Sequence, residues 1–231
     1  MIDFHSHLLP CMDDGSSSVD ESLSLLNMLA QQGVELVCAT PHFDPSRDSP
    51  SSFLERRQLS YEKIVSVWPD NSIPHITLGA EVMYFSGISG MENLSQLCIR
   101  GSKLLLLEMP FVTWSEYMMR EIINISSSGE VTIMLAHIER YLSLQNASTW
   151  KRLADNGILM QSNASFFINL KTRRKALRML RHAQIHFLGS DCHNVQYRPP
   201  RIDEAISIIE RKLGLRSLDA LWKFNESFFI G

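Results

Sequence analysis

MIDFHSH, residues 1–7, is a short apolar run that ends in two histidines separated by one residue. The side chains of a β-strand alternate between its two faces, so we expect His5 and His7 on the same side of a first strand. Two imidazoles fixed on one rigid element make half of a metal site. This stretch therefore predicts both the first strand of the fold and the beginning of a metal centre.

Six further apolar runs follow, and longer segments with helical spacing lie between them. Such an alternation without a linker predicts an α/β fold with one parallel sheet. Right-handed crossovers would carry the sheet towards a closed or nearly closed β/α barrel of the TIM type, and a doubly wound open sheet is the alternative. We expect residues 1–231 to form a single domain. The predicted strands lie at residues 1–5, 35–40, 75–80, 103–109, 131–137, 158–162 and 185–190.

Capping residues predict where several helices begin and end. Residues 18–21, Ser-Val-Asp-Glu, have the pattern of a capping box, and Gly33 marks the end of the helix that follows. Residues 113–116 are expected to cap another helix that ends near Gly129. Six cations within residues 171–182 predict a basic helix with a solvated face, and an acidic peptide partner or self-association is the alternative role.

The composition is that of an ordinary globular protein, with 45% hydrophobic and 20% charged residues in a chain of 231. A net charge of −3 gives no case for nucleic acid or an anionic membrane as the main partner. No apolar run reaches the ~20 residues of a membrane span, and the first residues lack the pattern of a signal peptide. We therefore expect a cytoplasmic protein without membrane insertion. Its four cysteines, none at C-x-x-C spacing, are not expected to form disulfides.

Potential metal ligands stand at the end of most predicted strands. His42 follows the second strand, Glu81 follows the third, and His137 ends the fifth. Because the carboxyl ends of all strands of a β/α barrel meet at one face, we expect residues far apart in the sequence to share one pocket. The candidate ligands are His5, His7, Asp14, His42, Glu81, Glu108, His137, Asp191 and His193.

Nine ligands are too many for one ion, because zinc binds about four and octahedral manganese or magnesium about six, including waters. Five histidines with four carboxylates suit two or three ions of Mn, Fe or Zn. Ions about 3.5–4 Å apart need a bridging carboxylate, and such a site clamps phosphate oxygens and generates hydroxide at neutral pH. The residues themselves do not decide between Asp13 and Asp14.

Two arginines are expected at the rim of the same face, Arg140 shortly after His137 and Arg198 shortly after His193. A guanidinium binds two phosphate oxygens at once, which predicts a phosphate clamp. The alternative is a salt bridge at the rim, with Glu139 or Glu204 as partner. Aromatic residues near the ligands are expected either to pack in the core or to form a slot for a flat substrate group: Phe43, Tyr84, Phe85, Phe111 and Trp114.

Residues 192–198 also have the C-x5-R spacing of cysteine-dependent tyrosine phosphatases. None of the five residues between Cys192 and Arg198 is Gly or Ser, whereas a tight anion-binding loop favours small residues. Asp191 would oppose the thiolate and repel phosphate. We therefore expect no cysteine chemistry at Cys192, although its sulfur remains a possible soft ligand.

Several stretches together resemble the PHP (polymerase and histidinol phosphatase) superfamily. Within it they are similar to the bacterial manganese-dependent protein-tyrosine phosphatases of capsule and exopolysaccharide operons. The ordered set with MDDG, AHIERY and SD-x-HN is more specific than H-x-H alone. The matching stretches, which span residues 1–200, are MIDFHSHLLPCMDDGSSSVDES, GVELVCATPHF, LGAEVMYF, LLLLEMPF, MLAHIERY and FLGSDCHNVQYRPP.

The resemblance implies a distorted seven-stranded barrel and a trinuclear site made by the nine candidate ligands, with Asp14 rather than Asp13. It implies that Arg140 and Arg198 contact phosphate, and that the substrate is phosphotyrosine on the tail of a partner tyrosine autokinase. Metal-activated hydroxide would then attack phosphorus, with Asp191 or His42 as general acid if the phenolate needs one. Two alternatives stay open: a small-molecule phosphoesterase of the histidinol-phosphatase kind, and a non-catalytic binding module that metal stabilises.

Overall fold

Each of the seven predicted apolar runs forms a strand, which confirms this part of the sequence analysis. The computed structural model describes residues 1–68 and 73–229. Two further short strands, β3 and β5, directly follow β2 and β4. Within the described ranges, the nine strands are β1 (Ile2–Ser6), β2 (Leu36–Ala39), β3 (His42–Phe43), β4 (His75–Leu78), β5 (Glu81–Met83), β6 (Leu104–Glu108), β7 (Thr132–Leu135), β8 (Leu159–Asn163) and β9 (Phe187–Gly189).

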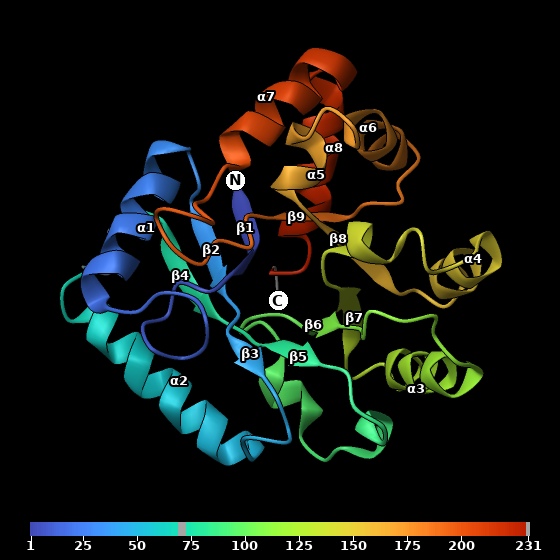
Figure 1. The fold of residues 1–231 in the computed structure, drawn as a ribbon, viewed down its shortest axis with the longest axis horizontal. Coiled ribbons are helices and arrows are strands. Elements are labelled where there is room, and N and C mark those ends of the chain that lie inside the picture. Colours follow the sequence, from blue (N-terminus) through green and yellow to red (C-terminus); the bar gives the residue numbers. More distant parts are fainter. Residues whose placement is uncertain (69–72, 230–231) are drawn as a thin grey trace.

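The strands curl around the middle of the molecule, and the helices lie outside them (Figure 1). All strand pairs are parallel; one sheet has the order β1-β2-β4 and the other the order β3-β5-β6-β7-β8-β9. An isolated parallel bridge between Ser6 and Cys192 joins β1 to the loop after β9. The α/β prediction is thus confirmed as a curled parallel sheet, and the alternative of an open sheet with helices on both faces does not describe this fold.

Two of the predicted strands are interrupted near their carboxyl ends. Thr40 and Pro41 separate β2 from β3, and Pro41 has no N–H group to donate to a neighbouring strand. Gly79 lies between β4 and β5, where a Cβ atom would come within 2.9 Å of the Ile99 side chain. Beyond these breaks the pairing continues between β3 and β5, which places His42 directly beside Glu81.

Neighbouring side chains of strand β1 face different surroundings. Phe4 packs in an apolar interior cluster against Phe187, with 4.6 Å between the ring centroids. The next residue, His5, faces the polar groups of the candidate metal centre, Glu81 and Asp191. The pairing register between β1 and β2 shifts between Asp3 and Ser6, and an irregularity of this kind re-aims side chains. One short strand therefore contributes to both the apolar interior and the site above it.

The helix ends follow the predicted caps with one correction. Ser18 caps α1 by accepting a hydrogen bond from the backbone of Glu21. Ser115, not Thr113, caps α3, because it directly precedes the helix and its hydroxyl reaches the backbone of Met118. Among the helices described, none has both the length and the apolar character needed to cross a membrane. The α-helices are α1 (Val19–Gln31), α2 (Pro50–Val65), α3 (Glu116–Ser127), α4 (Ala147–Asp155), α5 (Ala164–Ile168), α6 (Arg173–Arg181), α7 (Ile202–Leu213) and α8 (Leu215–Glu226).

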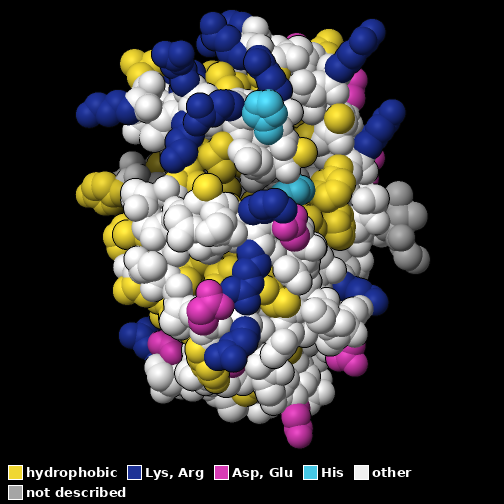
Figure 2. All heavy atoms as spheres, turned by 90° about the vertical axis from the view of Figure 1, so that its right-hand side faces the viewer, with side chains coloured by type: hydrophobic (Ala, Val, Ile, Leu, Met, Phe, Trp, Pro, Cys, Tyr) yellow, Lys and Arg dark blue, Asp and Glu magenta, His cyan; other side chains and the backbone are white. Residues whose placement is uncertain are grey.

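The predicted basic helix is α6, which buries Ala176 and Met179 and turns most of its cations outward. Figure 2 shows Lys and Arg side chains gathered on the upper part of the face that lies on the right in Figure 1, around hydrophobic and His side chains. A cavity of about 640 Å³ lies between α4 and α6, with Trp150 and Met179 among its walls. An acidic-peptide or self-association role for this helix stays a prediction.

Candidate metal centre

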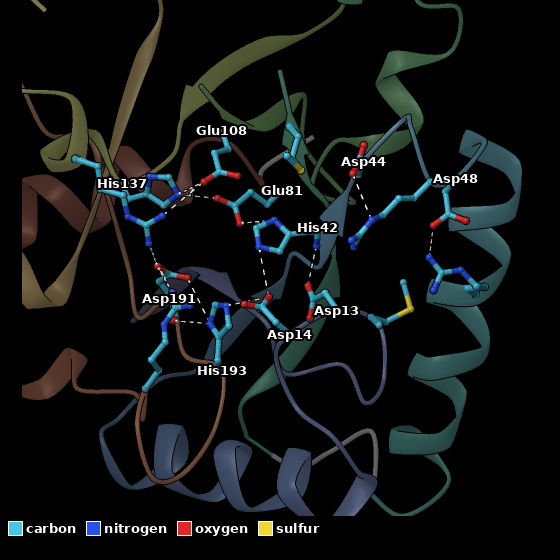
Figure 3. A pocket seen from close by; sticks show the side chains of 16 residues that line it. Asp13, Asp14, His42, Asp44, Asp48, Glu81, Glu108, His137, Asp191 and His193 are labelled. Atoms are coloured by element: carbon cyan, nitrogen blue, oxygen red, sulfur yellow. Dashed lines mark hydrogen bonds and ion pairs between the residues drawn. The ribbon is translucent and has the colours of Figure 1, made fainter. Parts of the chain in front are cut away.

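The predicted ligands converge on one cavity of about 590 Å³ at the carboxyl ends of the strands (Figure 3). His5 and His7 lie beneath it, fully buried against Glu81. Both predicted arginines, Arg140 and Arg198, also line the cavity. The convergence on which the sequence analysis depended is therefore present. The seven predicted ligands that line the cavity directly are Asp14, His42, Glu81, Glu108, His137, Asp191 and His193.

The carboxylate of Glu81 is at the centre of the cluster. Its Oε2 lies 3.0 Å from Nε2 of His5, 3.2 Å from Nε2 of His7 and 3.2 Å from Nδ1 of His42. Its Oε1 lies 2.8 Å from Nε2 of His137. Burial opposes ionisation of Glu81, but the charge of His5 and the hydrogen bonds from the imidazoles outweigh it and hold the pKa of this carboxyl well below its ordinary value. Glu81 thus occupies the place expected of a bridging carboxylate.

The donor atoms form three groups in which every atom lies within 4.8 Å of the others. The groups share His7, His42 and Glu81, an arrangement suited to neighbouring ions rather than one isolated ion. Asp191 adds a further oxygen, because its Oδ1 lies 3.4 Å from Nε2 of His7. The three groups are His7, Asp14, His42 and His193; His5, His7 and Glu81; and His42, Glu81 and Glu108.

Two buried ring nitrogens indicate whether the side chains of this cavity are suited to binding metal ions. Nδ1 of His42 and Nε2 of His193 have no hydrogen-bond partner within residues 1–68 and 73–229. A buried polar atom without a partner is costly, and native proteins rarely leave one. A divalent cation would give both nitrogens a partner, and a set of imidazoles and carboxylates is the one that Mn, Fe and Zn accept. The residues present therefore fit the ions that the sequence predicted.

The structure separates the two neighbouring aspartates. Asp14 is 68% exposed and its Oδ1 faces the site, 3.5 Å from Nε2 of His193 and 3.6 Å from Nε2 of His42. Asp13 instead accepts a 2.7 Å hydrogen bond from Nδ1 of His7 and another from the backbone of His42. Although burial opposes it, the hydrogen bond from His7 lowers the pKa of Asp13 to about 2. Asp13 therefore holds His7 with Nε2 directed at the centre, a role that sequence reasoning did not foresee.

Gln161 is a second residue that the sequence analysis missed. Its Oε1 accepts a 2.6 Å hydrogen bond from the backbone of His137 and lies 3.4 Å from Nδ1 of His5. Its amide group donates to Asn163, which in turn donates to Oδ2 of Asp191. The available signal was the switch from apolar to polar residues at the end of β8, where the other strands carry ligands.

Backbone conformation directs two of the ligands into the cavity. His137 has φ 30° and Asp191 has φ 53°, both in the left-handed region. This region is unfavourable for residues with a Cβ atom and is found at sites where a side chain must take an unusual direction. Each residue is the second one after the end of its strand, β7 or β9, and there the left-handed backbone turns its side chain towards Glu81 or the arginines.

Asp191 joins the ligand cluster to the two arginines. Its Oδ2 accepts hydrogen bonds from Arg140 at 2.9 Å and Asn163 at 2.8 Å, and lies 2.7 Å from Nη2 of Arg198. Burial opposes ionisation of Asp191, but the charge of His5 and the hydrogen bond from His7 outweigh it and hold the pKa of this carboxyl well below its ordinary value. In this arrangement Asp191 has no proton to donate.

The histidines differ in their protonation because their neighbours differ. Burial, His7 and Arg198 lower the pKa of His193 to about 4, so its ring stays neutral and able to bind a cation. Burial acts in the same direction on His137, but hydrogen bonds to Glu108 and Glu81 outweigh it and raise the pKa of His137 to about 9. In the metal-free protein, the carboxylates thus hold a proton on His137 that a cation would replace.

The expected alternative partners of the arginines were wrong. Glu139 is half-buried and accepts hydrogen bonds from Ser162 and the backbone of Asn163. Glu204 pairs with Arg201 at 2.5 Å. Arg140 and Arg198 are 41% and 39% exposed and reach into the cavity instead. Both guanidinium groups are therefore open to an anion in the cavity.

Cys192 is not placed for nucleophilic chemistry. Its side chain is fully buried, and burial together with the charge of Asp3 raises the pKa of the thiol to about 12. Arg198, the last residue of the C-x5-R spacing, pairs with Asp191 rather than with an anion-binding loop around the sulfur. Among the described residues, Cys192 also belongs to none of the three donor groups. This geometry gives no support for cysteine chemistry at Cys192, and the expectation that it performs none stays a prediction.

A parallel α/β fold with imidazoles, carboxylates and arginines around one open cavity is the arrangement on which polynuclear metal-dependent hydrolases are built. Residues 1–230 match the family "Capsular polysaccharide synthesis, CpsB/CapC", and the chain belongs to this family. This match confirms the resemblance to phosphatases of capsule operons.

Named relatives and a solved structure agree with this membership. The chain is 30% identical to tyrosine-protein phosphatase CpsB of Streptococcus agalactiae serotype III over 97% of this chain and 96% of the relative. It is 26% identical to tyrosine-protein phosphatase YwqE of Bacillus subtilis, over 93% and 85% of the two chains. One solved structure superposes on this chain with a TM-score of 0.84 at 23% identity, covering 99% of this chain and 94% of the other. It is described with YwqE of B. subtilis and CpsB of Streptococcus pneumoniae as "unique metal-dependent tyrosine phosphatases".

Proposed function

We propose that this chain is a metal-dependent protein-tyrosine phosphatase that acts on phosphotyrosine in the tail of a bacterial tyrosine autokinase controlling capsular or exopolysaccharide synthesis. The observation that carries the proposal is the single cavity in which Glu81 is surrounded by imidazoles while Arg140 and Arg198 meet at Asp191. Membership of the CpsB/CapC family and relatives named tyrosine-protein phosphatases support it. We expect it to act in the cytoplasm as one domain, residues 1–231.

The nine candidate ligands would hold two or three ions, and we propose Mn²⁺, with Fe or Zn as alternatives. Such ions, when bound, supply positive charge for the phosphate oxygens and acidify water enough to make a nucleophile at neutral pH. Glu81, which lies among four imidazoles, would be the central residue among those that hold them. Asp13 would keep Nε2 of His7 directed at them, since it accepts the hydrogen bond from Nδ1.

The two arginines would hold the phosphate at the cavity mouth. Each guanidinium is partly exposed and now shares the single oxygen Oδ2 of Asp191. A phosphate offers more acceptor oxygens and more charge than this one atom, so both arginines can turn donors towards it without losing a partner. Asp191 would keep them in place before and after the reaction.

The departing phenolate is a good leaving group, and a dedicated acid is of secondary importance. Asp191 and His42 are the two groups that the sequence suggested for this role. Of these, Asp191 is ionised and held by cations, whereas His42 is 27% exposed in the cavity. We therefore propose His42 as the acid if one is used, through Nε2, the ring nitrogen that the proposal does not assign to a cation.

We also infer that the two sheets act as one distorted barrel with seven strand positions. The support is that β3 continues β2, β5 continues β4, and β1 lies beside β9. In such a barrel, the strand ends would meet at one mouth and the ligands would need no large loop to reach it.

The alternatives are less well supported. A purely structural metal site closes its coordination sphere with protein ligands, whereas here the donors line an open cavity of about 590 Å³ with two arginines at its rim. A small ester such as histidinol phosphate would fit the cavity, but the named relatives are tyrosine-protein phosphatases.

Hydrolysis assays can test the proposal. The manganese-loaded protein is offered a phosphotyrosine peptide, the matching phosphoserine peptide and histidinol phosphate, before and after chelation. We expect phosphotyrosine to be hydrolysed fastest and chelation to abolish the reaction. Faster hydrolysis of histidinol phosphate, or undiminished activity after chelation, would overturn it.

A further inference from the structure

A second cavity of about 370 Å³ opens beside the metal centre. The two cavities share three wall residues, Met83, Glu108 and Arg140. Glu108 is a candidate ligand and Arg140 a candidate phosphate contact, so the side cavity begins where the phosphate is expected to lie. Its remaining walls are mostly apolar or aromatic, in contrast to the charged lining of the first: Tyr84, Met109, Pro110, Phe111 and Tyr141.

Phe111 is the most exposed aromatic residue of this cavity, whereas Tyr84 is half-buried and Tyr141 is buried. Its side chain is 68% exposed, and that of Met83 on the shared wall is 38% exposed. Of the other aromatics considered for a slot, Phe43 is fully buried and packs against Phe53, while Trp114 is buried against Tyr141. An exposed phenyl group beside a polar site leaves apolar surface in water, which a bound ring would cover.

The segment that carries Phe111 is fixed by hydrogen bonds. The indole of Trp114 donates to the carbonyl of Pro110 at 3.2 Å. The side chain of Gln145 accepts from the backbone of Trp114 at 3.1 Å and donates to the carbonyl of Val112 at 2.7 Å. Because the backbone on both sides of Phe111 is held before any ligand arrives, little backbone entropy would be lost when a ring packs on this side chain.

The wall opposite the solvent is equally constrained. The hydroxyl of Tyr84 donates to the buried carboxylate of Glu121 at 2.5 Å, which fixes its ring. Tyr141 is almost fully buried, with its hydroxyl 3.5 Å from Nδ1 of the candidate ligand His137. The side cavity is thus a preformed apolar recess that ends at the metal centre.

We propose that Phe111 and Met83, with Pro110, form an aryl subsite that receives the phenyl ring of a phosphate ester whose phosphate is held at Arg140. The inference rests on the proposed function, which it extends to the residues that select aryl over alkyl phosphates. An aromatic ring packs well on another ring and on a thioether. The side chain of a phosphoserine ends before the recess and leaves Phe111 in water.

A binding experiment that needs no turnover tests the subsite. Calorimetry of the manganese-loaded protein compares phenylphosphonate with methylphosphonate, which share the phosphonate group but differ in the ring. We expect the wild type to bind phenylphosphonate about tenfold more tightly, the size of effect expected for one aromatic contact. Phe111→Ala should bind both ligands almost equally, and Phe111→Tyr should keep the preference.

Val112→Ala is the matched control, because Val112 is the next residue, is 48% exposed and is not part of the recess wall. It should retain the wild-type preference. Circular dichroism and a melting curve verify that each variant is folded. A preference that survives in Phe111→Ala, the lack of any preference in the wild type, or the failure of both phosphonates to bind would overturn the subsite.

Hydrolysis of the phosphotyrosine peptide by the same preparations separates the two proposals. A wild type that prefers phenylphosphonate through Phe111 but hydrolyses no phosphoester would retain the subsite and overturn the phosphatase proposal. A wild type that hydrolyses the peptide without any phenyl preference would do the opposite. If both hold, Phe111→Ala should lose activity on the phosphotyrosine peptide mainly through a higher KM.

Discussion

The carboxylate of Asp13 accepts a 2.7 Å hydrogen bond from Nδ1 of His7, and Asp14, the next residue, directs its carboxylate at the centre instead. A group that orients a ligand typically changes metal affinity or activity by about 10–100-fold when it is replaced. We expect Asp13→Asn to weaken manganese binding within this range, because one amide oxygen cannot replace all the hydrogen bonds that the carboxylate accepts. Calorimetric titration with Mn²⁺ measures the effect. Asp20→Asn, on the exposed side of α1, is the control, and equal affinities in the two variants would refute the role of Asp13.

Glu81 should be the ligand whose loss the site tolerates least. Glu81→Gln removes the charge shared by four imidazoles, so we expect phosphatase activity to fall by more than about 100-fold, beyond the range for an orienting residue. In the metal-free protein it would also remove the central counter-charge of the buried imidazoles, which should lower the free energy of unfolding by about 3 kcal/mol. Denaturant unfolding in chelator measures this. Glu92→Gln, at an exposed position, should change neither quantity; a Glu81→Gln protein as stable and active as wild type contradicts the bridging assignment.

The two arginines should be sensitive even to substitution by lysine. Arg140→Lys and Arg198→Lys keep the charge but lose the planar fork that binds two oxygens. A hydrogen bond between charged groups is worth about 1.5–3 kcal/mol, so we expect kcat/KM for a phosphotyrosine peptide to fall by roughly 10- to 100-fold. Arg211→Lys on the exposed face of α7 serves as comparison and should match wild type. Full activity in both rim variants would remove the phosphate clamp from the proposal.

Removal of metal and removal of the thiol should have opposite outcomes. Chelation is expected to abolish phosphatase activity and to lower Tm, because bound cations stabilise only the folded state. Cys192→Ser should keep most of the activity, since the buried thiol has a raised pKa and lies outside the donor groups. Activity assays on both preparations, with Mn²⁺ added back to the chelated one, make the comparison. If the folded Cys192→Ser protein lost its activity while the chelated wild type kept it, the result would favour a cysteine mechanism instead.

Protonation of His186 should lower the free energy of unfolding in mildly acidic solution. Burial lowers the pKa of this imidazole from 6.5 to about 4, and its Nδ1 accepts a hydrogen bond from the backbone of Met160, which requires the neutral ring. Between these two pKa values the unfolded chain binds more protons than the folded one, so the stability contributed by His186 is present above pH 6.5 and is lost as the pH falls towards 4. Urea unfolding at pH 7.5 and 4.5 should show a smaller loss for His186→Gln than for wild type. The exposed His182→Gln should keep the wild-type loss, and an equal loss in both variants would refute the assignment.

Local sequence was sufficient for the strands and for the places of the candidate ligands along them. The seven apolar runs form strands because strand formation needs little more than a short run of apolar residues between turn signals. Ligands such as His42 and Glu81 stand at strand ends, and the shared direction of parallel strands brings them together. Ser18 and Gly33 likewise delimit α1 through interactions within one helical turn.

The roles of residues that depend on partners far away in the chain could not be predicted from the sequence. Gln161 supports His5 and His137 only because β8 lies between β7 and β9. The predicted salt-bridge partners of Arg140 were wrong, because nothing in the local sequence indicates that this side chain meets Asp191, 51 residues away. Phe111 was one of several equivalent aromatics until packing buried Phe43 and left Phe111 open.

By itself, the sequence determined that this protein is a parallel α/β protein with nine candidate ligands, Asp14 among them, and two rim arginines, because periodicity and strand-end position are properties of the chain alone. Only the tertiary structure decided that Asp13 holds His7, that Glu81 is central, and that Phe111 borders the arginine. The physical reason is that these roles depend on distances of about 3 Å between side chains from different strands and loops. Such distances follow from the breaks at Pro41 and Gly79 and from the left-handed turns at His137 and Asp191.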